Sequence, residues 1–368
     1  MYSVSETWAK ANDSFLAPEG LIEISCYIPE LKDALVYTKK DLISFTHQQT
    51  GSLVSGELPK NHIEFALDNS DGKWNPSNPT GLERYLSERL KITLRYGLNI
   101  NGVTEWISGG VFYLSEWYTP ANGIEASFVA RDLLEYMIDH PYTGAVAGTL
   151  YEVAERAIAE AGIPSDAVVS ISDELKNYSV GAIEYNGNES VAEILQKCAN
   201  AASCVMYQDR EGVLRVERLD YENTGFVFPR AISYAFPEIE FSRPLKAVSV
   251  SYSDADKVSF VYGTSGETQT LTNEFISTRV QAEEVAKWVC DSLRTRKKIS
   301  GEVRGDPRLD VFDVVDIESK YGTVNGVVLT EIKYSFTGAF RAAYTGYIRG
   351  IGTAVAIYSG EIYTGEVV

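Results

Sequence analysis

The amino-acid sequence predicts a predominantly β protein of the α+β class, in which two small antiparallel β-barrel domains flank an α+β domain and the second barrel carries a helical insertion. Short segments of alternating apolar and polar residues, separated by Gly, Asn and Pro, fill the first and last thirds of the chain. Tyr (23) and Phe (14), which favour strands, are abundant. Two helix capping boxes interrupt the strands in the middle. A chain of 368 residues is expected to form roughly two to three domains.

The first β-barrel is predicted over residues 20–132, after an N-terminal segment of residues 1–19. In "GLIEISCYIP" the apolar residues share one face, as in a half-buried strand. Further strands are expected in "HIEFALDN", "RLKITLRYG", "GVFYLSEWY" and "IEASFVARD". Turn residues separate these short segments, which is typical of a small barrel or sandwich.

The middle of the chain, residues 133–240, is predicted to be the α+β domain. Thr149 and Glu152 form one capping box, and Ser190 and Glu193 form another. Behind each box, apolar residues recur at helical spacing. The segment "CVMYQDREGVLRVERL" that follows predicts a β-hairpin with its turn at "DREG".

The last third returns to strands, and residues 241–350 are predicted to form the second β-barrel. A helical insertion is expected at about residues 264–298, where Glu283 is placed to pair with Lys287. Residues 351–368 are expected to be a C-terminal strand or tail. The unit "FDVVDIESKYG" and "NGVVLTE" resembles "RLKITLRYG" and "GVFYLSE" of the first barrel, either by chance or because the two barrels are related.

The charge and cysteine patterns narrow the class of protein. A net charge of −18, from 51 acidic and 33 basic residues, argues against holding nucleic acid by phosphate neutralisation. No apolar run approaches the roughly 20 residues of a membrane span, and the first residues do not resemble a secretory signal. We therefore expect folding in a cytoplasm and no membrane insertion. The four cysteines have no C-x-x-C spacing, so buried thiols are expected.

No catalytic, cofactor-binding or metal-binding motif is recognisable. The nucleophile elbow, the phosphate-binding loop and the H-E-x-x-H zinc motif are all missing from the sequence. The three histidines, His47, His62 and His140, have no partners at a meaningful spacing, and His62 with Glu64 on one strand face does not complete a site. We therefore expect no enzyme activity and no cofactor, while the sequence leaves glycosidase chemistry by a carboxylate pair open.

The segment "DNSDGKWNPSNPTG", residues 68–81, has three interpretations: a calcium loop, a sugar-binding loop, or a turn between two strands. The register of its acidic and amide side chains does not match a calcium loop, and Lys73 would oppose a cation. Asp71 and Gly72 supply the positive φ of a tight turn, and the two prolines favour an extended exit. The turn is the favoured interpretation.

The same loop resembles a turn in the first barrel of phage tail hub proteins, with the pattern D-N-x-D-G-[R/K]-[F/W]-x-P. "ISGGVFYLSEWY" is similar to that family's G-x-F-Y-[I/V/L] strand, "RGDPRLDVFDVVDIES" to its G-D-P-x-L-x-x-G-D-x-V stretch, and "EIKYSFTGAFRAAYTGY" to its closing hairpin with an F-x-G turn. Phe312 stands where the family usually has Gly, which leaves the geometry of that turn open. "YSVSETWAKANDS" resembles the amino terminus of hub proteins from phages of Gram-positive hosts. The matched signature residues, all with an expected structural role, are Asp68, Asn69, Asp71, Gly72, Trp74, Pro76, Gly110, Phe112, Tyr113, Gly305, Asp306, Pro307, Asp313, Phe336 and Gly338.

This resemblance implies a structural hub at the baseplate or tail tip of a phage or phage-like particle. In that family, three subunits with two barrels each form a pseudo-hexameric ring that continues the tail tube and joins it to a tip or spike. The implied partners are further copies of the chain as a homotrimer, the tail tube or distal tail protein, the tail spike or tip protein, and the tape-measure protein. DNA would pass without specific binding, and acidic residues facing the channel would repel it. The implied location is the virion tail, after assembly in the host cytoplasm.

Two other functions stay open from sequence. Tyr and Trp side chains on an exposed concave surface would indicate a receptor- or carbohydrate-binding tail-tip module. A cell-wall hydrolase at the tail tip is the other, although little of the chain follows the second barrel and we expect no room for such a domain.

Overall fold

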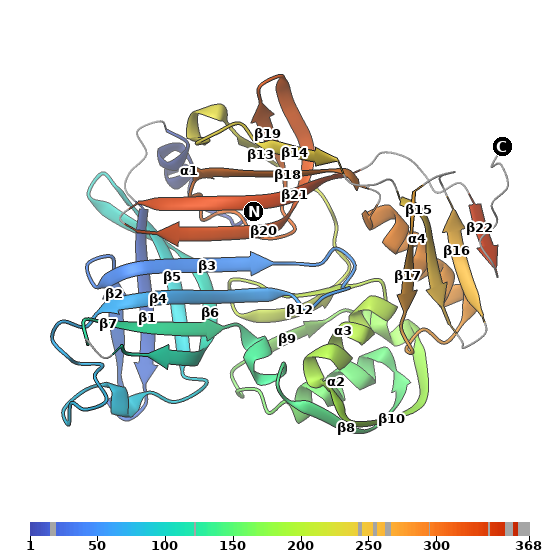
Figure 1. Ribbon diagram of the computed structural model, residues 1–368, viewed down its shortest axis with the longest axis horizontal. Coiled ribbons are helices and arrows are strands. Elements are labelled where there is room, and N and C mark those ends of the chain that lie inside the picture. The colour runs from blue at the N-terminus through green and yellow to red at the C-terminus, as the bar shows by residue number, and fades with distance from the viewer. Residues whose placement is uncertain are drawn as a thin grey trace.

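The computed structural model describes residues 1–14, 20–120, 123–241, 245–252, 256–261, 266–293, 295–337, 339–349 and 356–359. It is predominantly β with an α+β part, as the sequence predicts. Within the described residues, the strands form one large sheet of 13 strands and smaller sheets of two, three and four strands (Figure 1). None of the described helices has the length and apolar character of a membrane span.

The large sheet contains strands from both ends of the chain. Its path runs through β14 (Glu238–Phe241), β18 (Thr295–Arg304), β21 (Phe340–Arg349), β20 (Gly322–Phe336), β3 (Leu42–Thr50), β4 (Lys60–Asp68), β7 (Glu125–Arg131), β6 (Val103–Tyr118), β5 (Lys91–Ile100), β1 (Gly20–Ile28) and β2 (Asp33–Thr38). Off this path, β19 (Val314–Ser319) pairs with β20 and with β13 (Asn223–Phe228). The sheet continues from one predicted barrel region into the other.

The two strand-rich regions meet where β20 pairs with β3. This pairing is antiparallel and places Phe336 opposite Phe45 and Tyr334 opposite His47. The first region is strongly curled: β3 and β5 are not neighbours in the sheet, yet the ring of Phe45 on β3 packs edge-on against Tyr96 of β5, with 6.3 Å between centroids. The curl encloses one apolar core, and a second core lies between β18, β19, β20 and β21.

The α+β domain contains the two helices that the capping boxes predict. Helix α2 (Leu150–Glu160) and helix α3 (Val191–Ala201) each begin with the complete box, in which the cap side chain and the third helical residue bond to each other's backbone. They pack together beside β8 (Pro141–Thr149) and β10 (Ser179–Ser190). The predicted hairpin is present as β11 (Val205–Gln208) and β12 (Val213–Glu217), and β12 also pairs in parallel with β9 (Val168–Ile171).

Short helices occupy several connections. The N-terminal segment contains α1 (Glu6–Asp13), whose cap Ser5 accepts a 3.0 Å hydrogen bond from Trp8 N. The 3-10 helices are η1 (Glu83–Tyr85), η2 (Leu133–Tyr136), η3 (Asp173–Asn177) and η4 (Arg230–Ile232).

The insertion in the second strand-rich region begins earlier than the sequence predicts. The segments "PLKAVSVSYS" and "KVSFVYGT" are expected to be the first pair of strands of the second barrel, but neither joins the large sheet; the short strand β14, just before them, does. Strands β15 (Leu245–Ser251) and β16 (Lys257–Val261) form a separate sheet with β17 (Glu267–Thr272) and β22 (Ala356–Ser359), and α4 (Arg279–Leu293) packs on it. Four consecutive residues of β15, from Ala247 to Val250, are buried, so both faces of this strand are covered. This strand, buried on both faces, belongs to a separate layered unit and not to the half-exposed large sheet. The insertion predicted at about 264–298 therefore starts near residue 245.

Two details of this unit also differ from or refine the predictions. Glu283 forms its ion pair with Arg279, with Oε1 2.8 Å from Nε, and not with Lys287. Arg279 and Lys287 each lie four residues, about one helical turn, from Glu283. The ion pair forms with Arg279, the residue nearer the N-terminus of α4. The C-terminal segment is a strand at Ala356–Ser359, which pairs with β16 of the same chain; the rest of 351–368 lies outside the described residues.

Candidate functional site

The loop after β4 is a turn, and its geometry comes from side-chain to backbone bonds. Gly72 has φ of 69°, and Gly72 N donates to Asn69 O at 2.8 Å. The Asn69 side chain is buried and bonds in both directions, accepting from Trp74 N at 2.8 Å and donating to Gly123 O at 2.9 Å. Asp68 Oδ1 accepts from Ser70 N at 2.9 Å. The turn interpretation is confirmed.

Trp74 fixes this loop to the first core. Its side chain is 4% exposed and lies edge-on to Phe128, with 5.1 Å between ring centroids. Pro76, two residues later, is exposed. Lys73 Nζ lies 2.6 Å from Asp71 Oδ2 and so occupies the side of the carboxylate that a cation would take. No cluster of metal-ligating side chains occurs in the part of the chain that the structure describes.

The second signature lies in β6. Gly110 has φ of 135°, next to a register shift where β5 pairs with β6, and a Cβ there would lie 2.7 Å from the Phe112 ring. Phe112 is fully buried in the first core, while Tyr113 is buried on the opposite face, against the α+β domain. This strand therefore separates two cores, and its glycine permits the close ring contact.

The third signature belongs to a polar junction, defined by Arg210, Asp306, Arg308, Asp310 and the end of α1 (Asn12 and Asp13). Arg210, from the β11–β12 turn, is 4% exposed, and its Nε lies 2.7 Å from both carboxylate oxygens of Asp310. It also donates to the backbone oxygens of Pro307 and Leu309. Burial disfavours the charged guanidinium, but Asp310 outweighs this effect and the pKa of Arg210 is raised.

Arg308 closes the junction against the N-terminal segment. Its Nη2 donates to Asp306 Oδ2 at 2.6 Å and to Asp13 Oδ1 at 2.5 Å. Asn12 Nδ2 donates to the same Asp306 oxygen at 2.8 Å. Gly305 makes room for the neighbouring hairpin, since a Cβ at this position would lie 2.3 Å from the Phe340 ring. One polar network, buried except at Asp13 and in part at Asp310, thus joins α1, the signature loop and the α+β domain.

Phe312 takes the backbone conformation that a glycine would take. Its φ is 72°, and a bulky residue in this region costs about 1–2 kcal/mol. Its ring occupies the space above Gly51, where a Cβ would lie 2.3 Å from Phe312 Cζ, and packs edge-on to Tyr207. The turn at Phe312, whose geometry the sequence did not decide, therefore has the backbone conformation of a glycine turn. The contacts of the Phe312 ring offset the backbone strain.

The remaining signature residues lie beside the junction. Asp313 accepts an ion-pair contact from the amino group of Met1, and burial raises the pKa of the Asp313 carboxyl while that amino group opposes the rise. Phe336 is buried at the end of β20. Gly338 lies outside the described residues. The structure thus brings Gly305, Asp306, Pro307 and Asp313 together, and leaves the loop around Trp74 apart from them, on the first core.

His47 links the first core to the junction. Its Nδ1 lies 2.7 Å from Tyr96 Oη, and its Nε2 lies 2.9 Å from Asn61 Oδ1. Burial lowers the pKa of His47 to about 3, so the ring is neutral at physiological pH. Its ring neighbour Tyr334 donates to the backbone oxygens of Asp306 and Leu309, both at 2.7 Å. This histidine, which has no partner at a meaningful spacing in the sequence, is a satisfied core residue.

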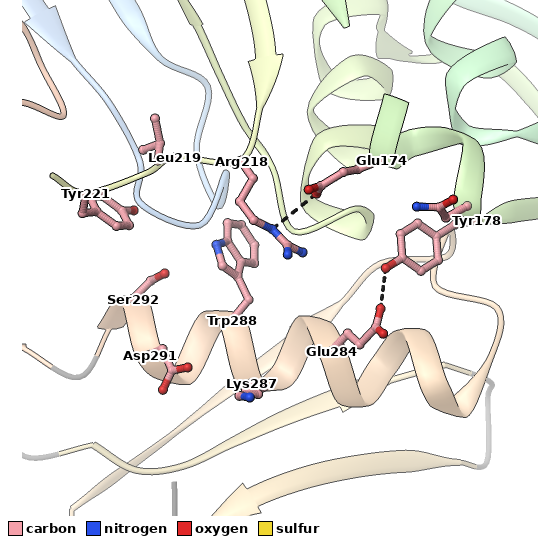
Figure 2. Close-up of a pocket in the computed structure, with 11 residues that line it drawn as sticks. Glu174, Tyr178, Arg218, Leu219, Tyr221, Glu284, Lys287, Trp288, Asp291 and Ser292 are labelled. Carbon is pink, nitrogen blue, oxygen red and sulfur yellow. Dashed lines mark hydrogen bonds and ion pairs between the residues drawn. The ribbon is translucent and has the colours of Figure 1, made fainter. Parts of the chain in front are cut away.

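A cleft of about 490 Å³ separates α4 from the α+β domain (Figure 2). Trp288 projects from α4 toward Arg218, whose Nε lies 3.3 Å from Glu174 Oε2. Tyr178 donates to Glu284 across the cleft; burial and this carboxylate raise the pKa of Tyr178. The full lining is Glu174, Asn177, Tyr178, Arg218, Leu219, Tyr221, Glu284, Lys287, Trp288, Asp291 and Ser292. The cleft is a concave surface with Tyr and Trp side chains beside charged groups.

Arg210 and Arg308 are the residues that the sequence did not single out. Arg210 lies in a segment recognisable only as a turn, and Arg308 falls on a variable position of the signature. Each finds its carboxylate through tertiary contacts, and Asp310 is 100 residues from Arg210. The one signal in the sequence for a buried ion pair is an arginine within a tight polar turn. This signal is weak, because arginines in turns are usually exposed to solvent.

Comparison with known proteins identifies the fold. No protein-family model and no curated protein sequence matches the chain. The tail protein from Neisseria meningitidis MC58 matches with a TM-score of 0.61 at 13% identity, covering 90% of this chain and 98% of that one. The prophage MuSo2 43 kDa tail protein from Shewanella oneidensis gives 0.60 at 14%, covering 89% and 98%. A chain of the Francisella PdpA-VgrG complex gives 0.54 at 10%, with 92% of this chain on 59% of that one. The chain has the fold of phage tail proteins.

Proposed function

We propose that this chain is a structural hub of a phage or phage-like tail, which assembles as a homotrimeric ring between the tail tube and a tip or spike and lets DNA pass. The observation that carries the proposal is the single sheet that joins two strand-rich regions side by side, in a fold shared with phage tail proteins. Two such regions per chain would let three copies occupy six similar positions. A partner at the tip or spike is supported by the likeness to a chain of the PdpA-VgrG complex.

The two ends of the large sheet supply a candidate subunit contact. Among the described strands, β14 pairs only with β18 and β2 only with β1, so each has an edge without a strand partner. Phe241 on β14 is 78% exposed and Val36 on β2 is 50% exposed. Exposed edges with apolar side chains are templates for another strand. In the proposed ring, β14 of one copy pairs with β2 of the next, a head-to-tail contact that closes with three copies.

The test is the mass of the purified chain in solution, measured by light scattering, together with ring formation in electron micrographs. We expect trimeric rings for the wild type. Phe241→Lys should raise the dissociation concentration at least about tenfold, since it places a charge at the edge contact. Tyr321→Lys is the matched control, because Tyr321 is 91% exposed and lies in the β19–β20 turn, outside the two edge strands. A monomer at every concentration would contradict the hub; rings that survive Phe241→Lys would contradict only this edge contact.

The acidic charge is consistent with a passage for DNA. Three copies at −18 each would carry −54. Acidic groups along the channel would repel the phosphate backbone and prevent its retention. A map of the assembled ring with a neutral or basic channel wall would contradict this part of the proposal.

A second candidate function, receptor or carbohydrate binding, is favoured by the cleft in Figure 2. Trp288 and Tyr178 offer aromatic faces, and the neighbouring carboxylates and Arg218 can hydrogen-bond to hydroxyl groups. A glycan array probed with the purified chain tests it, with Trp288→Ala as the variant and Tyr321→Ala as the control. Glycan signals that are lost in Trp288→Ala but kept in Tyr321→Ala would support glycan binding by the cleft. An array without signals would contradict glycan binding and would not affect the hub proposal. Enzyme activity is not part of the proposal, and a blank peptidoglycan zymogram is expected.

A further inference from the structure

A second cavity, of about 390 Å³, lies beside the end of β7 and contains a buried carboxyl group that lacks a complete set of partners. Asp132, the cap of η2, is 2% exposed. Its Oδ1 accepts a 3.0 Å hydrogen bond from Leu134 N, and its Oδ2 has no hydrogen-bond donor among the described residues. Buried carboxylate oxygens in native proteins are normally hydrogen-bonded, because an unpartnered one loses its hydration without replacement.

A second carboxylate lines the same cavity. Glu135 Oε2 is buried and receives no hydrogen bond; its nearest cation is Arg131 Nη1, at an ion-pair distance of 3.5 Å. Arg131 is also shared with Glu116, at 3.9 Å. Neither distance is that of a strong charge-assisted hydrogen bond. The resident arginine therefore does not satisfy the two buried oxygens.

The remaining residues that line this cavity give it an excess of negative charge and an apolar wall. Glu64 lies at the rim, 3.5 Å from His62, whose pKa is lowered mainly by burial, so this histidine is neutral near pH 7. Lys60 is the other resident cation. Side chains of Val129, Leu134 and Ile138 supply an apolar surface. A ligand for this cavity needs a compact cation that donates several hydrogen bonds, on a short aliphatic stem.

We propose that this cavity binds a primary alkylammonium group, carried either by a lysine of a neighbouring subunit or by a free polyamine. The ammonium donates to Asp132 Oδ2 and Glu135 Oε2, and its stem lies against the apolar wall. A guanidinium is a poorer fit because Arg131 already supplies one. Binding of an alkylammonium by the single chain does not depend on ring formation, whereas the lysine source rests on the assembly proposed above.

Binding should depend on pH because it requires an ionised Asp132. Burial raises the pKa of Asp132 to about 7, so a proton must leave before an ammonium binds. The surrounding groups are Lys60, His62, Glu64, Glu116, Arg131 and Glu135, with Arg89 and Asp139 near Glu135. Burial also raises the pKa of Glu135, while Arg131 and a hydrogen bond from Ser115 oppose the rise. With this value, about a tenth of Asp132 is ionised at about pH 6 and about nine-tenths at about pH 8, so affinity should rise about tenfold between them.

The experiment is calorimetric titration of the full chain with n-butylammonium at about pH 6 and about pH 8. Asp132→Asn keeps the oxygen that accepts from Leu134 N; it should weaken binding at least about tenfold at the higher pH and remove the pH dependence. Glu135→Gln should weaken binding by a smaller factor, and Glu155→Gln, an exposed acid on α2, should leave it unchanged. Absence of binding by the folded chain, or binding that is unchanged in Asp132→Asn, would overturn the proposal.

The source of the ammonium group is distinguished in the assembled protein. If a neighbouring lysine occupies the cavity, the assembled form should not bind n-butylammonium, and a zero-length carbodiimide should cross-link Asp132 or Glu135 to another subunit. If a polyamine is the ligand, the assembled form should bind putrescine and give no such cross-link. An assembled form that neither binds putrescine nor cross-links would contradict both sources.

Discussion

The polar junction and the helical core of the α+β domain hold the molecule together in opposite ways. The junction joins residues far apart in the chain through two buried arginines: Arg210 bonds to the partly exposed Asp310, and Arg308 bonds to the exposed Asp13. The helical core packs apolar faces of α2 and α3, and each helix begins with a cap formed by residues three positions apart. The first depends on tertiary structure, whereas the second is largely encoded in local sequence.

This difference determines how each region should respond to substitution. A buried ion pair is costly to break, because removal of one partner leaves an uncompensated charge in a low-dielectric site. A helix cap satisfies a few backbone groups near solvent, so its loss costs less. The junction should therefore be the more sensitive of the two regions, and the predictions for Arg210 and for the two helix caps test this ranking.

The largest effect is expected at Arg210. Arg210→Met leaves Asp310 without its buried partner and should lower the free energy of unfolding by about 3–5 kcal/mol, measured by urea denaturation. The control is Arg218→Met, since Arg218 is half-exposed and its ion pair with Glu174 should be worth less than about 1 kcal/mol. Equal losses in the two variants would show that the junction is no more sensitive than an exposed pair.

His47 offers a pH test of the contact between the first core and the junction. Its folded-state pKa of about 3 lies below its ordinary value of 6.5, so its contribution to stability is fully present above pH 6.5 and is lost as the pH falls toward 3. At pH 5 this loss should be about 2 kcal/mol. His47→Gln removes the titrating ring, so the wild type should lose about 2 kcal/mol more than this variant between about pH 7.5 and pH 5. Parallel pH curves would mean that the pKa of His47 is the same in the folded and unfolded states.

The sequence predicted the locally encoded parts of the molecule. The boxes at Thr149 and Ser190 placed two helices, and the hairpin turn placed β11 and β12, because capping and turn chemistry act over three or four residues. The loop containing Asp71 and Gly72 was correctly predicted to be a turn for the same reason.

The parts that the sequence did not predict depend on long-range contacts. Strand β15 alternates Val and Ser as a half-buried strand does, although both of its faces are buried. Nothing local distinguishes a strand of the large sheet from one that α4 covers, so the insertion was placed too late. At the junction the signature residues Asp306 and Asp313 were identified, but their partners Arg308 and Met1 were not. Pairing of buried charges is fixed by the topology of the sheet, which no periodicity in the sequence records.

The smallest expected effect tests the local side of the comparison. Thr149→Ala removes the side chain that accepts from Glu152 N, while the backbone of α2 and its buried face stay in place. The expected loss in the free energy of unfolding is about 1 kcal/mol, and Ser190→Ala should lose a similar amount at α3. Because the two caps share no hydrogen-bond partner, the double variant should lose the sum of the single losses.

Ser165→Ala is the control for these cap variants, since Ser165 is an exposed turn residue and its replacement should change stability by less than about 0.5 kcal/mol. A loss of about 3 kcal/mol or more at either cap would contradict the ranking, because it would make the start of a helix as sensitive as the buried Arg210. In that case the helices of the α+β domain would depend on their caps for docking against α4 as well as for their own formation, and local sequence would encode more of the tertiary structure than the comparison with the junction implies.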